Sequence, residues 1–113
     1  MAFKLSLKPS YAWPVSFTAP DDGEHVTQEF TAEFKRYNQQ QIDELFAKSR
    51  AGELKDDALV REVLLGWAGV LDDEGHELAW SIKKRDELLA IAHVRVAIVT
   101  AFIESLSGGA RKN

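Results

Sequence analysis

Two runs of alternating apolar and polar residues, separated by a turn sequence, constrain the fold of this 113-residue chain more than any other feature. Trp13, Val15 and Phe17 alternate with small or polar residues, and a second run at 26–35 repeats the two-residue period. This period is typical of strands that bury one face. Residues 19–23 read Ala-Pro-Asp-Asp-Gly, where proline presets φ and glycine tolerates positive φ. The sequence therefore predicts an antiparallel hairpin with one apolar face.

A third strand is expected from Phe3, Leu5 and Leu7, which also alternate with polar residues. Pro14 cannot donate a ladder hydrogen bond, so its strand is expected at an edge of the sheet. The apolar face of such a sheet has to be covered by another layer. We therefore expect one α+β domain, residues 1–113: a three-stranded antiparallel meander at 1–37 packed against three or four helices at 38–107, and a flexible tail at 108–113.

Helical spacing follows the predicted sheet. Asn38 is a good N-cap residue with Gln41 at the capping-box position, and Gly52 ends this first helix. A second helix is expected to have Asp56 or Asp57 as its N-cap and to end in the segment 66–70. Its apolar residues at helical spacing are Leu59, Val60, Val63, Leu64 and Trp67. Ser81 is expected to cap a further helix at 82–91, with Ile82, Leu88, Leu89 and Ile91 on its inner face. The sequence leaves open whether the last helical run at 93–106 is separate from it.

Composition excludes several classes of function. The chain contains no cysteine, which removes disulfides, thiolate metal sites and cysteine nucleophiles. Its three histidines lack metal-type spacing, and no nucleophile elbow or phosphate-binding loop is present. A net charge of -4 argues against nucleic acid as a partner. No apolar run is long enough to span a membrane, and the N-terminus does not resemble a secretory signal. We expect a non-enzymatic cytoplasmic protein without cofactor or metal.

The last helical run is apolar over a broad arc of the helical wheel, about 160° against the roughly 100° that a surface helix needs. One interpretation is that the sheet and the earlier helices cover both sides of this arc. The other is that part of the arc receives another chain. For the second case, the candidate contact residues are Val99, Phe102, Ile103 and Leu106.

The order of these features resembles the tail assembly chaperones of long-tailed bacteriophages and prophages. The β-rich first third leads through Phe34-Lys35-Arg36 into an Asn-Gln-Gln-Gln-Ile-Asp-Glu-Leu helix. The strongest part of the resemblance is the segment 63–80, which contains Val-Leu-Leu-Gly-Trp-Ala-Gly-Val followed by Asp-Asp-Glu-Gly-His-Glu-Leu. Within it, we interpret five residues as structural, namely as a helix C-cap, a core indole and turn residues: Gly66, Trp67, Gly69, Val70 and Gly75.

The resemblance implies a protein that binds the long, helical tape measure protein in the host cytoplasm and keeps it soluble. Such a chaperone leaves before the tail is finished and is absent from the virion. A frameshifted, extended form would recruit the tail tube protein, and self-association into a homo-oligomer stays open. Two alternatives are a minor structural tail or head-tail joining protein, and a small host-directed binding module.

Overall fold

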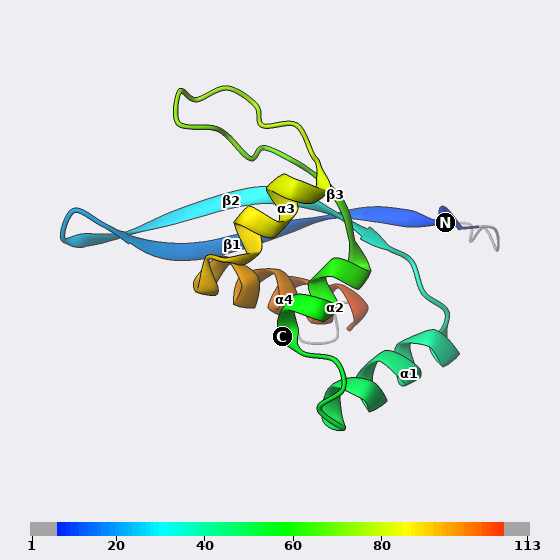
Figure 1. Ribbon diagram of the computed structural model, residues 1–113. Coiled ribbons are helices and arrows are strands. Elements are labelled where there is room, and N and C mark those ends of the chain that lie inside the picture. Colours follow the sequence, from blue (N-terminus) through cyan, green and yellow to red (C-terminus); the bar gives the residue numbers. More distant parts are fainter. Residues whose placement is uncertain (1–6, 108–113) are drawn as a thin grey trace.

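The structure is a computed structural model that describes residues 7–107. The elements in chain order are β1 (Ser10–Asp21), β2 (Glu24–Lys35), α1 (Gln39–Arg50), α2 (Asp56–Val63), β3 (Leu64–Ala68), α3 (Ile82–Leu89) and α4 (Ala92–Leu106). The sheet has the order β1-β2-β3, and both strand pairs are antiparallel. Helices lie along one side of this sheet (Figure 1), which confirms the expected α+β fold.

The hairpin of β1 and β2 forms as predicted. The strands pair along their whole 12-residue lengths, and Asp21 lies opposite Glu24. Asp22 and Gly23 connect them with φ values of 51° and 84°, as a type I′ turn requires. The predicted burial of the apolar face is also observed, because Val15 and its cross-strand partner Phe30 are both buried.

β1 is an edge strand, as its proline predicts. Pro14 lies opposite Thr31, and Pro20 lies opposite His25. Counting from the tight turn, both positions fall on non-hydrogen-bonded pairs, so the proline nitrogens face the open edge. Two backbone donors are therefore missing from this edge, which makes it a poor template for a strand of another chain.

The third strand is not the one that the sequence predicts. Phe3 and Leu5 lie outside the described residues, and Leu7 is not in a strand. Instead, β3 pairs with residues 31–34 of β2, so a strand lies within the region 38–107 that was expected to be helical. The predicted second helix ends at Val63, before the segment 66–70.

Two features explain why the chain turns from helix to strand at this point. β2 offers a free edge whose backbone groups need partners, and β3 supplies them. Gly66 would weaken the interior of a helix, whereas in the strand it lies opposite Glu33. The register shifts between Glu33 and Phe34, which leaves Leu65 as the extra residue of a β-bulge. A short apolar run fits a helix or a strand, so the periodicity of residues 64–68 alone does not decide which of the two they form.

Helix ends follow the predicted caps with one exception. Asn38 Oδ1 accepts from the Gln41 amide at 2.8 Å, and the Gln41 side chain accepts from the Asn38 amide at 2.9 Å, which completes the capping box. Ser81 Oγ accepts from the Lys84 amide at 3.0 Å. The N-cap of α2 is Lys55 rather than an aspartate, although both aspartates stand in its first turn.

α4 is the central helix of the domain. It packs on β1 and contacts α2 and α3, whereas α1 lies at the periphery (Figure 1). The axes of α3 and α4 differ by 105°, so the two helices are separate. The buried core is apolar and draws on sheet and helices alike: Val15, Phe30, Ala32, Phe34, Leu45, Leu59, Val60, Val63, Leu64, Leu89, Val94, Ile98, Ala101 and Phe102.

Candidate functional site

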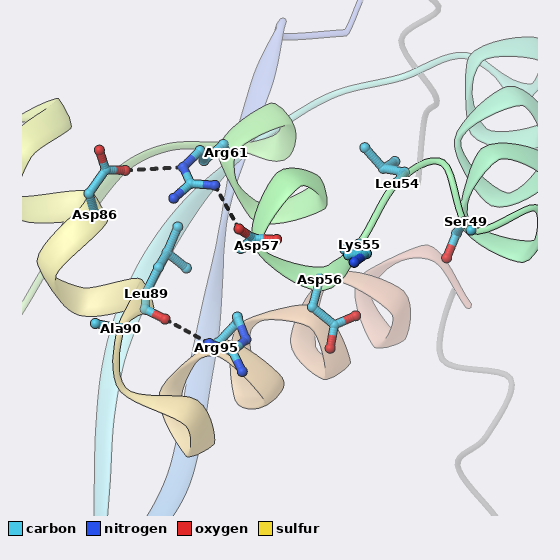
Figure 2. A pocket seen from close by; sticks show the side chains of 11 residues that line it. Ser49, Leu54, Lys55, Asp56, Asp57, Arg61, Asp86, Leu89, Ala90 and Arg95 are labelled. Atoms are coloured by element: carbon cyan, nitrogen blue, oxygen red, sulfur yellow. Dashed lines mark hydrogen bonds and ion pairs between the residues drawn. The ribbon is translucent and has the colours of Figure 1, made fainter.

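An open hollow of about 690 Å³ lies between the α1–α2 connection, α2, α3 and the start of α4. Figure 2 shows the Arg61 side chain of α2 directed toward Asp57 of the same helix and Asp86 of α3. Its charged lining residues are Lys55, Asp56, Asp57, Arg61, Asp86 and Arg95. The hollow is therefore open to water and lined by charged groups, with Leu54 and Leu89 adding apolar surface.

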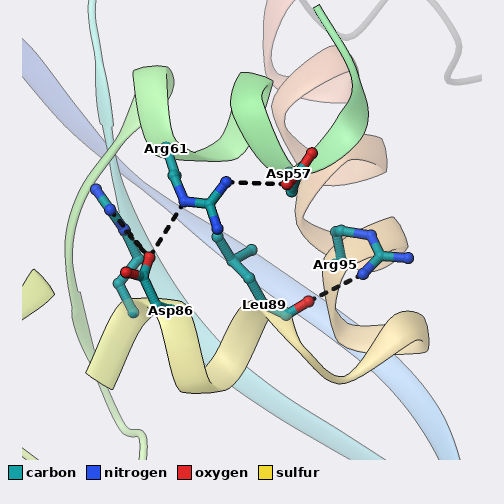
Figure 3. A network of polar contacts seen from close by, with 6 residues as sticks. Asp57, Arg61, Asp86, Leu89 and Arg95 are labelled. Carbon is teal, nitrogen blue, oxygen red and sulfur yellow. Dashed lines mark hydrogen bonds and ion pairs between the residues drawn. The ribbon is translucent and has the colours of Figure 1, made fainter. Parts of the chain in front are cut away.

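Arg61 connects two helices across this hollow. Its Nη1 donates to Asp57 Oδ2 at 2.9 Å within α2, and its Nε donates to Asp86 Oδ1 of α3 at 3.2 Å (Figure 3). The hydrogen bond from Arg61 is the main reason why the pKa of Asp57 lies below its usual range. For Asp86, the hydrogen bond from Arg85 lowers the pKa most, and that from Arg61 comes second. The side chains of Asp57, Arg61 and Asp86 are all exposed, so the hydrogen bonds of Arg61 orient α2 against α3 at modest free energy.

Arg95 holds the junction of α3 and α4. Its Nη1 donates to the backbone oxygen of Leu89 at 3.0 Å (Figure 3). Leu89 is the last residue of α3, where carbonyl groups lack partners within the helix. The hydrogen bond therefore secures the sharp turn into α4.

We expect Arg61→Gln to lower the thermal midpoint slightly at neutral pH and to have no effect in strong acid. The carboxylates that it pairs have lowered pKa values, so their stabilisation is complete above the ordinary aspartate pKa of about 3.9. This stabilisation disappears as the pH falls through the lowered pKa values of Asp57 and Asp86. Thermal melts followed by circular dichroism at about pH 7 and about pH 2 measure the difference. Arg95→Gln is the control, since its carbonyl partner does not titrate; an equal loss for Arg61→Gln at both pH values would contradict the expectation.

The candidate contact residues of α4 divide into two groups. Phe102 is 1% exposed, and its ring packs edge-on against Phe34 at 5.3 Å and against Tyr37 at 6.4 Å between centroids. Its assignment as a surface contact is therefore corrected: Phe102 belongs to the core. Ile103 is 47% exposed, and Val99 and Leu106 are half-buried. These three follow the spacing i, i+4, i+7 and lie along one face of α4.

The structural residues of the segment 63–80 build a loop rather than a helix end. Gly69 and Gly75 have φ values of 86° and 85°, which confirms them as turn glycines. Gly66 is inside β3, so its assignment as a helix C-cap is wrong. The Trp67 indole is half-buried, with its Nε1 donating to the Leu78 oxygen at 2.8 Å. Val70 is half-buried against the core.

Several aliphatic residues are exposed, among them Ile82 and Ile91, whose predicted place on the inner face of the helix at 82–91 is therefore corrected. These exposed residues are Leu65, Leu71, Ile82, Ile91 and Val96. Leu71 directly precedes the acidic turn at 72–74, and Ile91 directly precedes α4. Each residue is the last of an apolar pattern, so whether its side chain is buried depends on how neighbouring segments pack against it. Sequence periodicity does not show which of them remain exposed.

Residues 7–107 contain no group of three His, Asp or Glu side chains that could hold a metal ion. No single helix of this region is long and apolar enough to cross a membrane; α3 and α4 meet the length and composition test only as a pair bent by 105°.

Comparison with protein-family models, curated proteins and solved structures found no match to this chain.

Proposed function

We propose that this chain is a tail assembly chaperone of a long-tailed bacteriophage or prophage. It binds the tape measure protein in the host cytoplasm and keeps it soluble until tail tube subunits polymerise around it. It makes and breaks no covalent bond, and it is absent from the finished virion. A frameshifted, extended form would add a contact with the tail tube protein.

The observation that carries this proposal is the aliphatic stripe of α4. Val99, Ile103 and Leu106 lie on one face of that helix and are half-buried or exposed. Such a stripe can receive the apolar face of a client helix. Micromolar binding corresponds to about -8 kcal/mol, which a few aliphatic anchors can supply after the cost of association. Binding at micromolar affinity also allows the client to dissociate as assembly proceeds. The resemblance of the segment 63–80 to this family supports the same function.

Co-expression with the tape measure protein of the same phage tests the proposal. We expect this chain to keep the tape measure protein in the soluble fraction, and Ile103→Asp to reduce that fraction severalfold. Ile103→Leu is the matched control, because it preserves an apolar side chain of the same size. Equal precipitation with and without this chain would contradict the chaperone function. Its presence in purified virions by mass spectrometry would favour a structural tail protein instead.

A further inference from the structure

A continuous depression runs beside the α3–α4 junction, apart from the stripe of α4; it is mainly apolar toward the hairpin and mixed in character toward the acidic turn at 72–74. Two adjoining hollows of about 530 and 690 Å³ share the same four lining residues from the loop after β3, from α3 and from the junction. These four shared residues and Phe17 of the hairpin form what we call the apolar trough: Phe17, Val70, Leu71, Leu88 and Ile91.

The trough is assembled from segments that are far apart in the sequence. The loop 69–81 leaves the body of the domain after β3 (Figure 1) and brings Leu71 beside α3. α3 contributes part of one helical face, because residues 84, 87 and 88 follow the spacing i, i+3, i+4, and Ile91 in the junction after α3 lines the same hollow. Leu71 is 57% exposed and Ile91 is 44% exposed. Large aliphatic side chains are thus open to water within a concave surface, which is typical of a groove that binds an apolar helix face.

Carboxylates surround the trough. Five of them line the two hollows: Glu29, Asp72, Asp73, Glu74 and Glu87. The lysine among the lining residues, Lys84, already contacts Glu87 Oε1 at 3.4 Å. His76, close to the acidic turn, lies 3.6 Å from Glu74 Oε1, and both side chains are well exposed. The rim is therefore strongly acidic and favours a partner with positive charge beside its apolar face.

We infer that the apolar trough binds an amphipathic helix whose apolar stripe is flanked by lysine or arginine. This inference rests on the proposed function, since the natural source of such a helix would be a segment of the tape measure protein. Aliphatic residues of the helix enter between Leu71 and Ile91, and its basic residues meet the acidic turn at 72–74. The trough thus selects clients by charge, which the uncharged stripe of α4 does not.

A synthetic probe tests the trough directly. The probe is a Leu-rich amphipathic helical peptide with lysines flanking its apolar stripe, and a second peptide carries glutamates instead. We expect the lysine peptide to shift the amide resonances of Leu71 and Ile91 in NMR titrations and to bind at least about tenfold more tightly than the glutamate peptide. Raised salt should weaken its binding. Equal binding of both peptides, or shifts confined to α4, would overturn the inference.

Ile91→Asp is the decisive variant. Ile91 occupies the N-cap position of α4, where aspartate is favoured, so the domain is expected to remain folded. We expect Ile91→Asp to weaken binding of the lysine peptide at least about tenfold. Ile82→Asp is the matched control: it adds the same charge at a residue 61% exposed in the first turn of α3, where acidic groups are tolerated. Equal effects of the two variants would overturn the inference.

A charge variant tests the rim separately. Asp73→Asn combined with Glu74→Gln removes two carboxylates, while Asp72 continues to accept from the amides of Glu74 and His76. We expect weaker binding of the lysine peptide and a smaller dependence on salt. Unchanged affinity and salt dependence would overturn the part assigned to the acidic rim.

Client and self-association experiments separate the trough from the function. If Ile91→Asp keeps the tape measure protein as soluble as the wild-type chain does, the trough is not the client site and the chaperone function stands. If the wild-type chain fails to keep it soluble but the lysine peptide binds in the trough, the function fails and the trough stands. A dimer in analytical ultracentrifugation that Ile91→Asp dissociates would show that a second copy occupies the trough, against the inference.

Discussion

Phe102→Ala is expected to lower the thermal midpoint by about 12–20 °C. The side chain is 1% exposed and contacts aromatic rings from β2 and from the segment before α1. Truncating a buried phenylalanine costs about 3–5 kcal/mol, and each kcal/mol shifts the midpoint of a domain this size by about 4 °C. The whole domain has roughly 6–17 kcal/mol of stability, so this single ring accounts for much of it. Thermal unfolding followed by circular dichroism measures the shift.

The neighbouring residue supplies the control. Phe102→Asp places a charge in the apolar core and should leave the chain unfolded, whereas Ile103→Asp should remain folded because Ile103 is exposed. Two adjacent residues of one helix thus give opposite outcomes. A folded Phe102→Asp protein with near-native stability would show that Phe102 is not part of the core and would reopen its assignment as a contact residue.

Trp67→Ala is expected to lower the midpoint by about 8–12 °C and to release the loop 69–81. The Trp67 ring packs edge-on against Trp80, with 5.0 Å between centroids, and its indole nitrogen donates to the Leu78 oxygen. Losing the ring contact, the hydrogen bond and part of the apolar burial costs about 2–3 kcal/mol in all. Both contacts lie across the loop, so they fix its return to α3.

Two measurements separate these contributions. Trp67→Phe keeps an aromatic ring but loses the hydrogen bond, and should lower the midpoint by only about 4 °C. The Leu78 amide donates to the Val70 oxygen at 2.7 Å, so its hydrogen exchange reports whether the loop is closed. We expect exchange at Leu78 to become fast in Trp67→Ala and to stay slow in Trp67→Phe. Continued protection in Trp67→Ala would show that other contacts hold the loop.

Local chemistry explains which parts of the structure were predictable. The hairpin depends on a two-residue period and on a turn at residues 22 and 23 that requires positive φ, and both signals lie within one short segment. The capping box of Asn38 and the Ser81 cap also act over three residues. Such features are visible in sequence because neighbouring residues alone decide them.

The third strand shows where local signals end. Residues 64–68 carry apolar side chains that suit a helix or a buried strand equally well, and the free edge of β2 decides between them. That edge belongs to a segment about thirty residues earlier in the chain. The sequence pattern therefore predicts the number of strands and the character of the sheet, but assigns the third strand to residues 3–7.

By itself, the sequence determined the α+β class, the hairpin with its turn, the separate caps of the helices and the apolar character of the last helix. Only the tertiary structure decided that Phe102 faces the core while Ile103 faces water, because one residue turns a helix by about 100° and the neighbouring elements choose the covered side. The apolar trough likewise exists only after β1, the loop 69–81, α3 and the start of α4 have come together, since its lining residues are drawn from all of these segments.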